Sequence, residues 1–451
     1  MRSLLTRAGS LALLAAATMV VSPAAGAARS WSPPTVLGPA VSDMGPPDLA
    51  VAPDGEAIAT WVGSRPKRVL ISSRRPGEGW SQPVAVAPVR EEVEGPSLAV
   101  SAGKAVIVWA DNIRTRRGEA RVVFAATRLR GERWSRPRNI SAEKRWYEEP
   151  RGSEPQVAMT PRGKAIVVWQ AENEKHPAVS FIGSATQAAA GTDWTAPVGI
   201  RGSAEGEVPQ VAMTAAGEAV AIWGASYNEE SNINVSSRPP KGAWKWAGQL
   251  GTPGPFPQPQ LAMTARGEAV GAWVEEPEGG LESTVQVTTR KPGGKWKVKT
   301  LAPQDYGTGP QIVTEPGGRA TVFWGNFDSL DEYEVRSSIH APGGAWSRST
   351  SAAAEGLQLT SPSESPIAVT RRGESIALWI GEGPLGERTT LLSSSRRRPQ
   401  AWSEPQRVPT SPCGQLYGAP NLALALAPNG KAFAAWRCFN GTRWVLKSAS
   451  R

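Results

Sequence analysis

The sequence contains very few of the residues that enzymes most often use for nucleophilic, acid–base or metal chemistry. Its 451 residues include only two histidines, His176 and His340, and two cysteines, Cys413 and Cys438. The histidines lie far apart in the chain, so neither a Ser-His-Asp triad nor a histidine-rich metal centre is expected. The acidic stretch "DSLDE" at 328–332 lacks the ligand spacing of a dedicated calcium loop. We therefore expect no bound metal and no cofactor.

The sequence also lacks a second long apolar run after its first residues. At the start, Arg2 and Arg7 precede an apolar run over 11–21, and small residues follow as far as Ala27. This layout is typical of a secretory signal peptide with cleavage after Ala27. A membrane anchor is the alternative, but the run is too short to cross about 30 Å of hydrocarbon. We expect a signal peptide over 1–27 and a single domain over 28–451, secreted to the exterior or associated with the cell envelope.

The two cysteines fit this expectation of export. In an oxidising compartment a single pair of cysteines usually forms one disulfide. A pair of metal ligands is the alternative, but no histidine lies near either cysteine in the sequence. We predict a Cys413–Cys438 disulfide.

Acidic residues are outnumbered by basic ones, with 50 Lys and Arg against 40 Asp and Glu and a net charge of +10. A basic exported protein can associate with anionic polymers or lipid headgroups. The sequence has no long Lys/Arg run with interleaved aromatic residues, so we expect no nucleic-acid partner.

A repeat dominates what the sequence does contain. A segment such as "VAMTAAGEAVAIW" recurs eight times at spacings of 48 to 60 residues, and each copy ends in tryptophan: Trp61, Trp109, Trp169, Trp223, Trp273, Trp324, Trp379 and Trp436. A period in this range indicates a repeat architecture. Each copy resembles a hairpin, with two apolar strands joined by a turn rich in Gly, Asp, Asn and Arg.

Two further strands follow each hairpin, and the fourth begins at a second tryptophan. Four strands repeated eight times predict an all-β, eight-bladed β-propeller with antiparallel blades. The last unit stops after its third strand, and the segment "WSPPTVLG" from Trp31 resembles a fourth strand. We therefore predict that the N-terminal strand completes the last blade and closes the ring.

The repeat accounts for 16 of the 19 tryptophans, eight at the end of second strands and eight at the start of fourth strands. Buried aromatic side chains contribute much of the apolar area of a core, so packing between blades explains these sixteen. Trp146, Trp246 and Trp444 are left over.

The turn before the fourth strand carries a family resemblance. "SRRPGEGW" at 73–80, "TRLRGERW" at 127–134 and "TRKPGGKW" at 289–296 place Ser or Thr seven residues before Trp and Gly three before it. This skeleton resembles the Asp-box of sialidase-like propellers, Ser-x-Asp-x-Gly-x-x-Trp, at the same turn. The aspartate is replaced in every copy, by Arg75, Leu129, Ala189, Pro239, Lys291, Ala341 and Arg397. The resemblance implies the propeller fold.

The resemblance does not extend to a catalytic site. The sialidase family uses an arginine triad and a Phe/Tyr-Arg-Ile-Pro stretch, and the sequence has no such Arg-Ile-Pro stretch. Eight-bladed quinoprotein propellers space the Gly and Trp of their docking motif more closely, so we do not infer pyrroloquinoline quinone.

Charge is sorted between the two faces that such a propeller would have. Turns within blades, such as "SRRPG" and "TRKPGGK", are basic and share the face that we call the bottom; loops such as "VREEVEGP" and "VEEPEGG" are acidic and share the top. Simple solvation explains charged turns but not the segregation of sign. One hypothesis is that the basic bottom face rests on an anionic polymer of the cell envelope.

Two sets of residues predict a ligand-binding site on the top face. All five tyrosines fall in segments assigned to top loops, and Trp146 adjoins one of them: Trp146, Tyr147, Tyr227, Tyr306, Tyr333 and Tyr417. A Pro and a polar residue begin most first strands, as in Pro420-Asn421, and four of these polar residues are glutamines: Gln156, Gln210, Gln260 and Gln311. The alternatives are displacement of tyrosine from strands of small aliphatic residues, and capping of strand ends.

The sequence therefore predicts a secreted, monomeric binding or scaffold module without catalytic activity. Its top face would recognise a glycan, a cell-envelope polymer or a surface protein, because tyrosine and tryptophan combine rigid apolar area with a polar group. The alternative is a divergent sialidase-like glycoside hydrolase or a polysaccharide lyase. Glycosidic hydrolysis needs two carboxylates at a set separation, and the acidic top loops offer many candidates without identifying a pair. The catalytic residues of that alternative are unknown.

Overall fold

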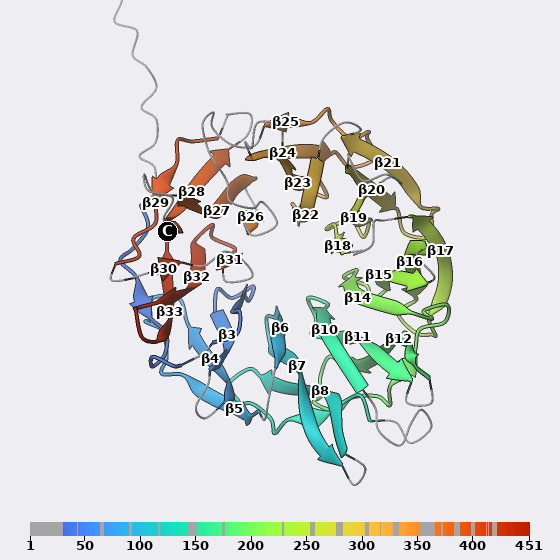
Figure 1. Cartoon of the computed structure of the whole chain (residues 1–451), viewed down its shortest axis with the longest axis horizontal. Helices are drawn as coiled ribbons and strands as arrows, with labels where there is room; N and C mark the ends of the chain where they lie inside the picture. Colours follow the sequence, from blue (N-terminus) through green and yellow to red (C-terminus); the bar gives the residue numbers. More distant parts are fainter. Residues whose placement is uncertain are drawn as a thin grey trace, which may run out of the picture. The chain divides into compact units, whose positions relative to one another are not determined.

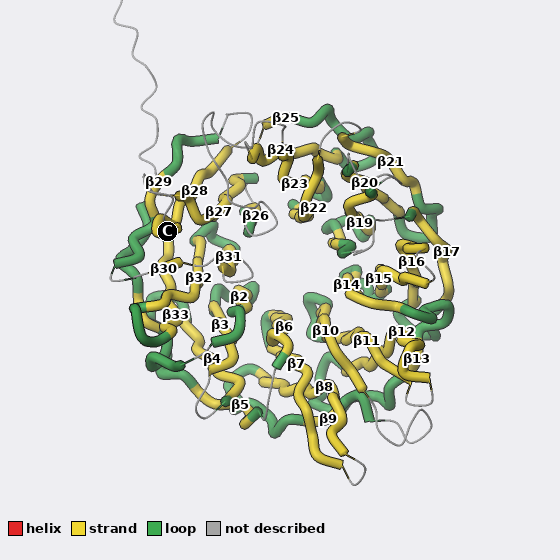
Figure 2. The backbone as a smooth tube through the Cα atoms, in the orientation of Figure 1, coloured by secondary structure: helices red, strands yellow, loops and turns green. Residues whose placement is uncertain are grey.

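The computed structural model consists of strands and loops arranged as a ring of eight blades (Figures 1 and 2). The chain divides after Ser30, and the ring is formed by the unit Trp31–Arg451. The structure describes residues 30–42, 44–63, 67–89, 93–115, 118–142, 151–173, 176–227, 230–252, 258–276, 283–302, 306–315, 317–327, 333–351, 366–370, 373–382, 388–397, 402–411, 413, 415–416 and 422–451. The predicted signal peptide at 1–27 lies outside these residues. No helix in the described part of the chain is long and apolar enough to cross a membrane.

Each blade is an antiparallel sheet, and in blades 1 to 7 the strands follow one another in sequence from the centre of the ring outward (Figure 1). The innermost strands of blades 1 to 8 are β2 (Asp48–Val51), β6 (Glu94–Ser101), β10 (Arg151–Met159), β14 (Gly206–Met213), β18 (Gln260–Met263), β22 (Tyr306–Thr314), β26 (Ile367–Val369) and β31 (Leu422–Leu426). The second strands are β3 (Ala57–Gly63), β7 (Lys104–Thr115), β11 (Ala165–Asn173), β15 (Ala219–Tyr227), β19 (Ala269–Glu275), β23 (Ala320–Phe327), β27 (Glu374–Glu382) and β32 (Ala432–Phe439).

The outer half of each blade is built in the same order. The third strands are β4 (Arg68–Arg74), β8 (Gly118–Leu129), β12 (His176–Gln187), β16 (Glu230–Arg238), β20 (Thr284–Arg290), β24 (Tyr333–His340), β28 (Arg388–Arg397) and β33 (Trp444–Ser450). The fourth strands are β5 (Val84–Pro88), β9 (Arg138–Asn139), β13 (Val198–Gly199), β17 (Lys245–Gly251), β21 (Lys297–Ala302), β25 (Thr350–Ser351), β29 (Gln406–Arg407) and β1 (Thr35–Val36). A short strand, β30 (Gln415–Leu416), adds to blade 8 beside β32. The prediction of eight four-stranded blades is confirmed.

The two ends of the ring meet in blade 8, as predicted. β1 pairs with β33, with Thr35 opposite Ser448 and Val36 opposite Lys447. The Ser32 N–H donates to the Ser450 carbonyl at 2.8 Å, and the Trp31 indole donates to Ser393 Oγ of blade 7 at 2.8 Å. The N-terminal segment thus extends blade 8 and contacts blade 7.

The repeated tryptophans form the core between blades. Trp61, Trp109, Trp169, Trp223, Trp273, Trp324 and Trp436 are fully buried, and Trp379 is 5% exposed. The second set of eight tryptophans lies in the segments just before the fourth strands rather than at their first residues, and these side chains are buried or half-buried. Each buried cluster combines residues from neighbouring blades; for example, Trp169 packs with Val106 and Val123 of blade 2. Packing therefore explains these sixteen residues.

A threonine sets the first hairpin turn in several blades. In blade 3, Thr160 Oγ1 accepts the Lys164 N–H at 3.0 Å, while the Gly163 N–H donates to the Thr160 carbonyl at 2.9 Å. Gly163 has φ 88°, a left-handed conformation that favours glycine. Thr214, Thr264 and Thr370 accept the equivalent bond. This turn explains the recurring Thr-x-x-Gly of the sequence.

Two of the three remaining tryptophans are described. Trp246 lies on the outer strand β17 and is 44% exposed. Trp444 begins β33, with its ring 5.3 Å from that of Phe439 and the Arg437 guanidinium 4.3 Å above it. Trp444 therefore packs locally, and Trp246 is partly exposed on the outer strand while its ring lies 6.1 Å from that of Trp223.

Candidate ligand-binding site

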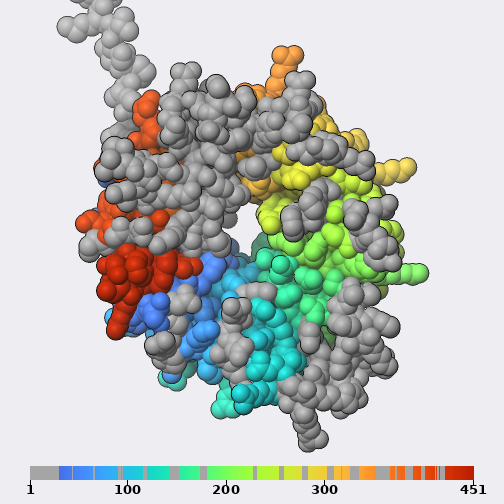
Figure 3. All heavy atoms as spheres, viewed as in Figure 1, coloured from blue at the N-terminus to red at the C-terminus, as the bar shows by residue number. Residues whose placement is uncertain are grey.

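The innermost strands border the centre of the ring, where the space-filling view shows an opening (Figures 1 and 3). Six of these strands carry a polar residue at one position, opposite the residue that precedes the buried tryptophan: Asp48, Ser97, Gln156, Gln210, Gln260 and Gln311. We call these six residues the channel ring. Equal register places them at one level of the ring.

A bulge precedes the channel ring in four blades. The pairing of the first and second strands shifts immediately before Ser97, Gln156, Gln210 and Gln311. In blades 3, 4 and 6 the residue before the proline has a left-handed backbone, with φ 50° at Glu154, 47° at Val208 and 46° at Gly309. This conformation is strained for a β-branched residue such as Val208. Bulges re-aim neighbouring side chains, which here are the residues of the ring.

The Glu154 side chain links the bulges of blades 3 and 4. This contact was not predicted from the sequence. Glu154 Oε2 accepts the Val208 N–H at 2.9 Å, so the residue before the proline in blade 3 bonds to its counterpart in blade 4. The recurrence of a residue and proline before each ring position was visible in the sequence. The contact itself joins residues 54 positions apart and depends on how the blades stack.

Blades 7 and 8 interrupt the channel ring. The Leu378 N–H donates to the Pro366 carbonyl at 3.1 Å, which places Pro366 at the ring position of blade 7. In blade 8 that position is Ala423, which pairs with Ala435 before Trp436. The predicted Pro420-Asn421 entry is therefore wrong for the ring, because two additional residues separate Asn421 from the hairpin. Asn421 itself lies outside the described residues.

In blades 1 and 2 the ring residues bind the backbone of the next blade. Asp48 accepts the Leu49 N–H at 2.7 Å and the Leu98 N–H of blade 2 at 2.8 Å. Ser97 Oγ accepts the Val157 N–H of blade 3 at 3.3 Å. Burial raises the pKa of Asp48 to about 6, although the N–H groups of Leu98 and Leu49 favour its ionised form. These two side chains therefore bond backbone groups, as in the capping alternative, but the groups of Leu98 and Val157 lie inside β6 and β10 rather than at strand ends.

The four glutamines differ from Asp48 and Ser97. Gln156, Gln210, Gln260 and Gln311 are each half-buried. Within the part of the chain that the structure describes, none of their amides makes a hydrogen bond to the protein. Four successive blades thus present amides with both donors and acceptors available.

The tyrosines lie at a different level. Tyr227 ends β15, Tyr306 begins β22 and Tyr333 begins β24, so the prediction that they lie in loops is wrong for these three. Strand pairing continues further than expected, with Tyr306 opposite Phe327 and Phe327 opposite Tyr333. Tyr306 stands five residues before Gln311, or roughly 16 Å along the strand at about 3.3 Å per residue. These tyrosines and the glutamines therefore do not form one cluster.

Trp146, Tyr147 and Tyr417 lie outside the described residues. Within the described ranges, no group of three or more His, Cys, Asp or Glu side chains is arranged to hold a metal ion. Of the six channel-ring residues, Asp48 is the sole carboxylate. The ring by itself therefore does not supply the pair of carboxylates that glycosidic hydrolysis needs.

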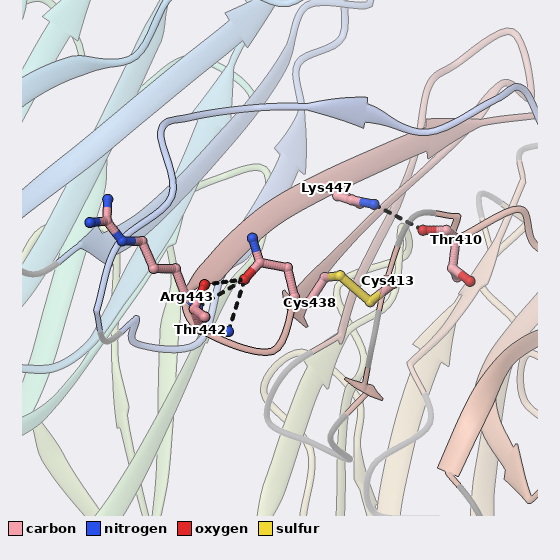
Figure 4. Close-up of a disulfide and its surroundings, with 7 residues drawn as sticks. Thr410, Cys413, Cys438, Thr442, Arg443 and Lys447 are labelled. Atoms are coloured by element: carbon pink, nitrogen blue, oxygen red, sulfur yellow. Dashed lines mark hydrogen bonds between the residues drawn. A yellow bond between two sulfur atoms is a disulfide. The ribbon is translucent and has the colours of Figure 1, made fainter.

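The predicted disulfide is confirmed and lies on the top side of blade 8 (Figure 4). Cys413 and Cys438 are bonded, with their Cα atoms 5.7 Å apart. The bond holds the segment before β30 against the end of β32, where Leu416 pairs with Cys438. Lys447 Nζ of β33 donates to the Thr410 carbonyl at 2.9 Å, which adds a second link between this segment and blade 8 (Figure 4).

The bottom face is less uniformly basic than the sequence predicted. Glu56 contacts Arg128 at 2.6 Å, and Glu218 contacts Arg290 at 3.0 Å. These glutamates belong to the first hairpin turn of one blade and the arginines to the third strand of the next. These two arginines are therefore paired with glutamates of the preceding blade, which reduces the excess of positive charge on this face.

No protein-family model matches the sequence, and no curated protein shows significant similarity to it. Several solved structures are weakly similar. A Hadza microbial sialidase is 14% identical with a TM-score of 0.43, and the match covers 63% of this chain and 63% of the sialidase, less than two thirds of its length. A Dyadobacter fermentans protein of unknown function is 10% identical with a TM-score of 0.44, covering 93% of this chain and 98% of that one.

A Penicillium chrysogenum α-L-arabinanase complexed with arabinobiose is 13% identical with a TM-score of 0.42, covering 66% of this chain and 92% of that one. These weak similarities do not assign a function to the chain.

Proposed function

We propose that this protein is an exported, non-catalytic binding module whose channel ring recognises a neutral, hydroxyl-rich ligand such as a glycan. One observation carries the proposal: Gln156, Gln210, Gln260 and Gln311 present four half-buried amides at one level of the ring, without a hydrogen bond to any described residue. Each amide offers two donors and an acceptor, which suits hydroxyl groups that both donate and accept.

The shape and charge of the ring support a neutral ligand. The four glutamines carry no charge, and the one carboxylate of the ring, Asp48, already accepts two backbone N–H groups. The amides lie on blades 3 to 6, whereas Pro366 and Ala423 occupy blades 7 and 8. A ligand would therefore bind on one side of the channel. The tyrosines at the strand ends, together with Trp146 and Tyr147, would contact the part of a long ligand that extends out of the top.

Export is part of the same proposal. The first 27 residues have the layout of a signal peptide, and the Cys413–Cys438 disulfide is of the kind that persists in an oxidising compartment. N-terminal sequencing of the exported protein would test the cleavage site after Ala27.

The test is a glycan and cell-wall binding screen, followed by affinity measurements on Gln210→Ala, Gln260→Ala and the double variant. Each lost hydrogen bond is worth about 0.5–1.5 kcal/mol, so each single variant should bind about two- to tenfold more weakly. Gln406→Ala, on the outer strand β29, is the matched control and should bind normally. Trp146→Ala and Tyr147→Ala test the top loops in the same way.

Unchanged binding in the double glutamine variant would remove the channel ring as the site. Incubation of the wild-type protein with each bound glycan tests the enzymatic alternative, because release of new reducing ends would establish hydrolysis.

A further inference from the structure

The same two residue positions recur in every blade on the bottom face, where one blade adjoins the next. One member is the residue that follows the glycine of the first hairpin turn: Glu56, Lys104, Lys164, Glu218, Glu268, Arg319, Glu374 and Lys431. The other is the residue at the end of the third strand in the following blade: Arg128, Gln187, Arg238, Arg290, His340, Arg396, Arg451 and, closing the ring, Arg74. We call each such pair of positions a junction.

Four junctions pair a glutamate with a cation or a histidine. Besides Glu56–Arg128 and Glu218–Arg290, Glu268 Oε2 lies 3.2 Å from His340 Nε2, and Glu374 Oε1 lies 3.9 Å from Arg451 Nη2. Arg128, Arg290 and His340 each follow their glutamate by 72 residues. Each of the four turn glutamates therefore has a basic side chain or a histidine of the next blade as its partner.

Where the turn residue is a lysine or an arginine, its charged group mostly contacts an atom other than the partner side chain. Lys104 Nζ donates to the Ala188 carbonyl at 2.6 Å, and Lys164 Nζ donates to the Pro240 carbonyl at 2.6 Å. Arg319 contacts Glu315 of its own blade at 3.6 Å.

The junction between blades 8 and 1 differs from all of these. Lys431 Nζ and the Arg74 guanidinium each lie 5.6 Å from the centre of the Phe433 ring, so two cations converge on one aromatic side chain. In blades 2, 5 and 7 the equivalent arginine instead lies over the tryptophan of its own blade. Burial, and to a lesser degree the nearby Arg74, lowers the pKa of Lys431, which agrees with their proximity.

No carboxylate of the described residues neutralises these two cations. Arg74 Nε donates to the Glu78 carbonyl at 2.7 Å, which leaves the two terminal nitrogens of its guanidinium. Within the described part of the chain neither Arg74 nor Lys431 forms an ion pair, and Lys431 Nζ makes no hydrogen bond. Both side chains are half-buried and so remain reachable from solvent.

We infer that the junction between blades 8 and 1 is a binding site for a phosphate group. Two converging cations match the charge of about −1.5 to −2 that a phosphate monoester carries at neutral pH. The terminal nitrogens of Arg74 can bind two phosphate oxygens as a fork, while Lys431 supplies a second, more compact charge. The bound phosphate takes the place of the glutamate that is present at four other junctions.

The repeat supplies a variant that removes the site without disturbing the fold. Lys431→Glu converts this junction to the Glu–Arg type that the protein already uses between blades 1 and 2. The introduced carboxylate should pair with Arg74, so the variant should unfold at the same temperature as the wild type or higher. Lys295→Glu is the matched control, because Lys295 is an exposed lysine of a bottom turn and the change in net charge is the same.

Isothermal titration with inorganic pyrophosphate and with a soluble polyphosphate tests the proposal. The wild-type protein should bind at least one of them; binding of both indicates a site for any phosphate group, and binding of polyphosphate alone indicates a site for a polymer. Lys431→Glu should bind at least about tenfold more weakly, the equivalent of one charged hydrogen bond, and Lys295→Glu should bind normally. Absence of binding to the wild type, retention of binding by Lys431→Glu, or equal loss in Lys295→Glu would each overturn the proposal.

Discussion

Among single residues, Asp48 stands apart because a carboxylate occupies a position that glutamine fills in four other blades. Its two oxygens accept the N–H groups of Leu49 and Leu98, and the second bond links blade 1 to blade 2. Burial nevertheless dominates and raises the pKa of Asp48 from 3.8 to about 6. The Asp48 carboxyl is therefore harder to ionise in the folded protein than in the unfolded chain, although it is still ionised at neutral pH.

This shift makes stability depend on pH. Asp48 is protonated in both states below about pH 3.8, so it imposes no cost there. As the pH rises from about 4 to above 6, its ionisation lowers the free energy of unfolding by up to about 3 kcal/mol, at about 1.4 kcal/mol per pH unit. Asp48→Asn should remove this decline, so the stability of the variant relative to wild type should increase by up to that amount. Denaturant unfolding at pH 4, 5, 6 and 7 measures the difference, and parallel pH profiles would contradict the assignment.

The place of a single residue could be predicted from the sequence where it follows from the geometry of one hairpin. Contacts that depend on how neighbouring blades stack could not. The four glutamines lie a fixed distance before the buried tryptophan, so their common level was predictable. The bonds of Asp48 and Ser97 to the next blade were not, because they depend on the distance between innermost strands. Three of the junctions had a visible signal in the sequence, because Arg128, Arg290 and His340 each follow a turn glutamate by 72 residues, which is longer than one repeat.

Among elements, the packing of Trp169 over the paired strands β11 and β12 depends on one glycine. Gly183 lies directly opposite Trp169, and a Cβ placed on Gly183 would lie 2.5 Å from the indole of Trp169. Other blades place larger residues opposite this tryptophan, such as Leu70 in blade 1 and Phe124 in blade 2. The strand pair of blade 3 therefore has its own packing within a common fold.

Gly183→Ala should destabilise the protein by about 1–3 kcal/mol, because the added methyl group overfills a packed core. Gly79→Ala is the control, since no atom lies within 4 Å of the Cβ that it would add. Thermal unfolding of the two variants measures the difference. Equal midpoints for both would show that Trp169 can move aside without cost.

Strand existence and order were predictable because each hairpin repeats its own pattern of apolar residues and turn glycine. Strand ends were not, since the pairing of β23 with β24 continues to Phe327 and Tyr333, where no turn signal separates strand from loop. The lack of a sequence signal at strand ends also explains why Asn421 was wrongly predicted at the ring position. Two extra residues enter before the blade 8 hairpin, and a proline–polar pair alone does not reveal the shift.

For the whole molecule, the segment that begins at Trp31 closes the ring. It bonds to β33 through β1, through the Leu37 N–H to Leu446 at 2.9 Å, and through Val41 and Trp444, whose backbones bond to each other. Trp31 is 6% exposed and packs among residues of blades 7 and 8. Without this segment β33 becomes an open edge, and unpaired edges promote aggregation.

Deletion of residues 31–41 from the mature protein should therefore weaken the whole ring rather than blade 8 alone. The loss of a buried tryptophan costs about 3–5 kcal/mol, and the loss of the β1–β33 hydrogen bonds adds to this. The truncated protein should unfold at a lower temperature and self-associate, as measured by scanning calorimetry and light scattering. A synthetic peptide of residues 31–42 added in trans should restore part of the stability, because it can re-pair with β33. A truncated protein that unfolds like the wild type would show that the seam between blades 7 and 1 is held by the other blade 8 strands alone.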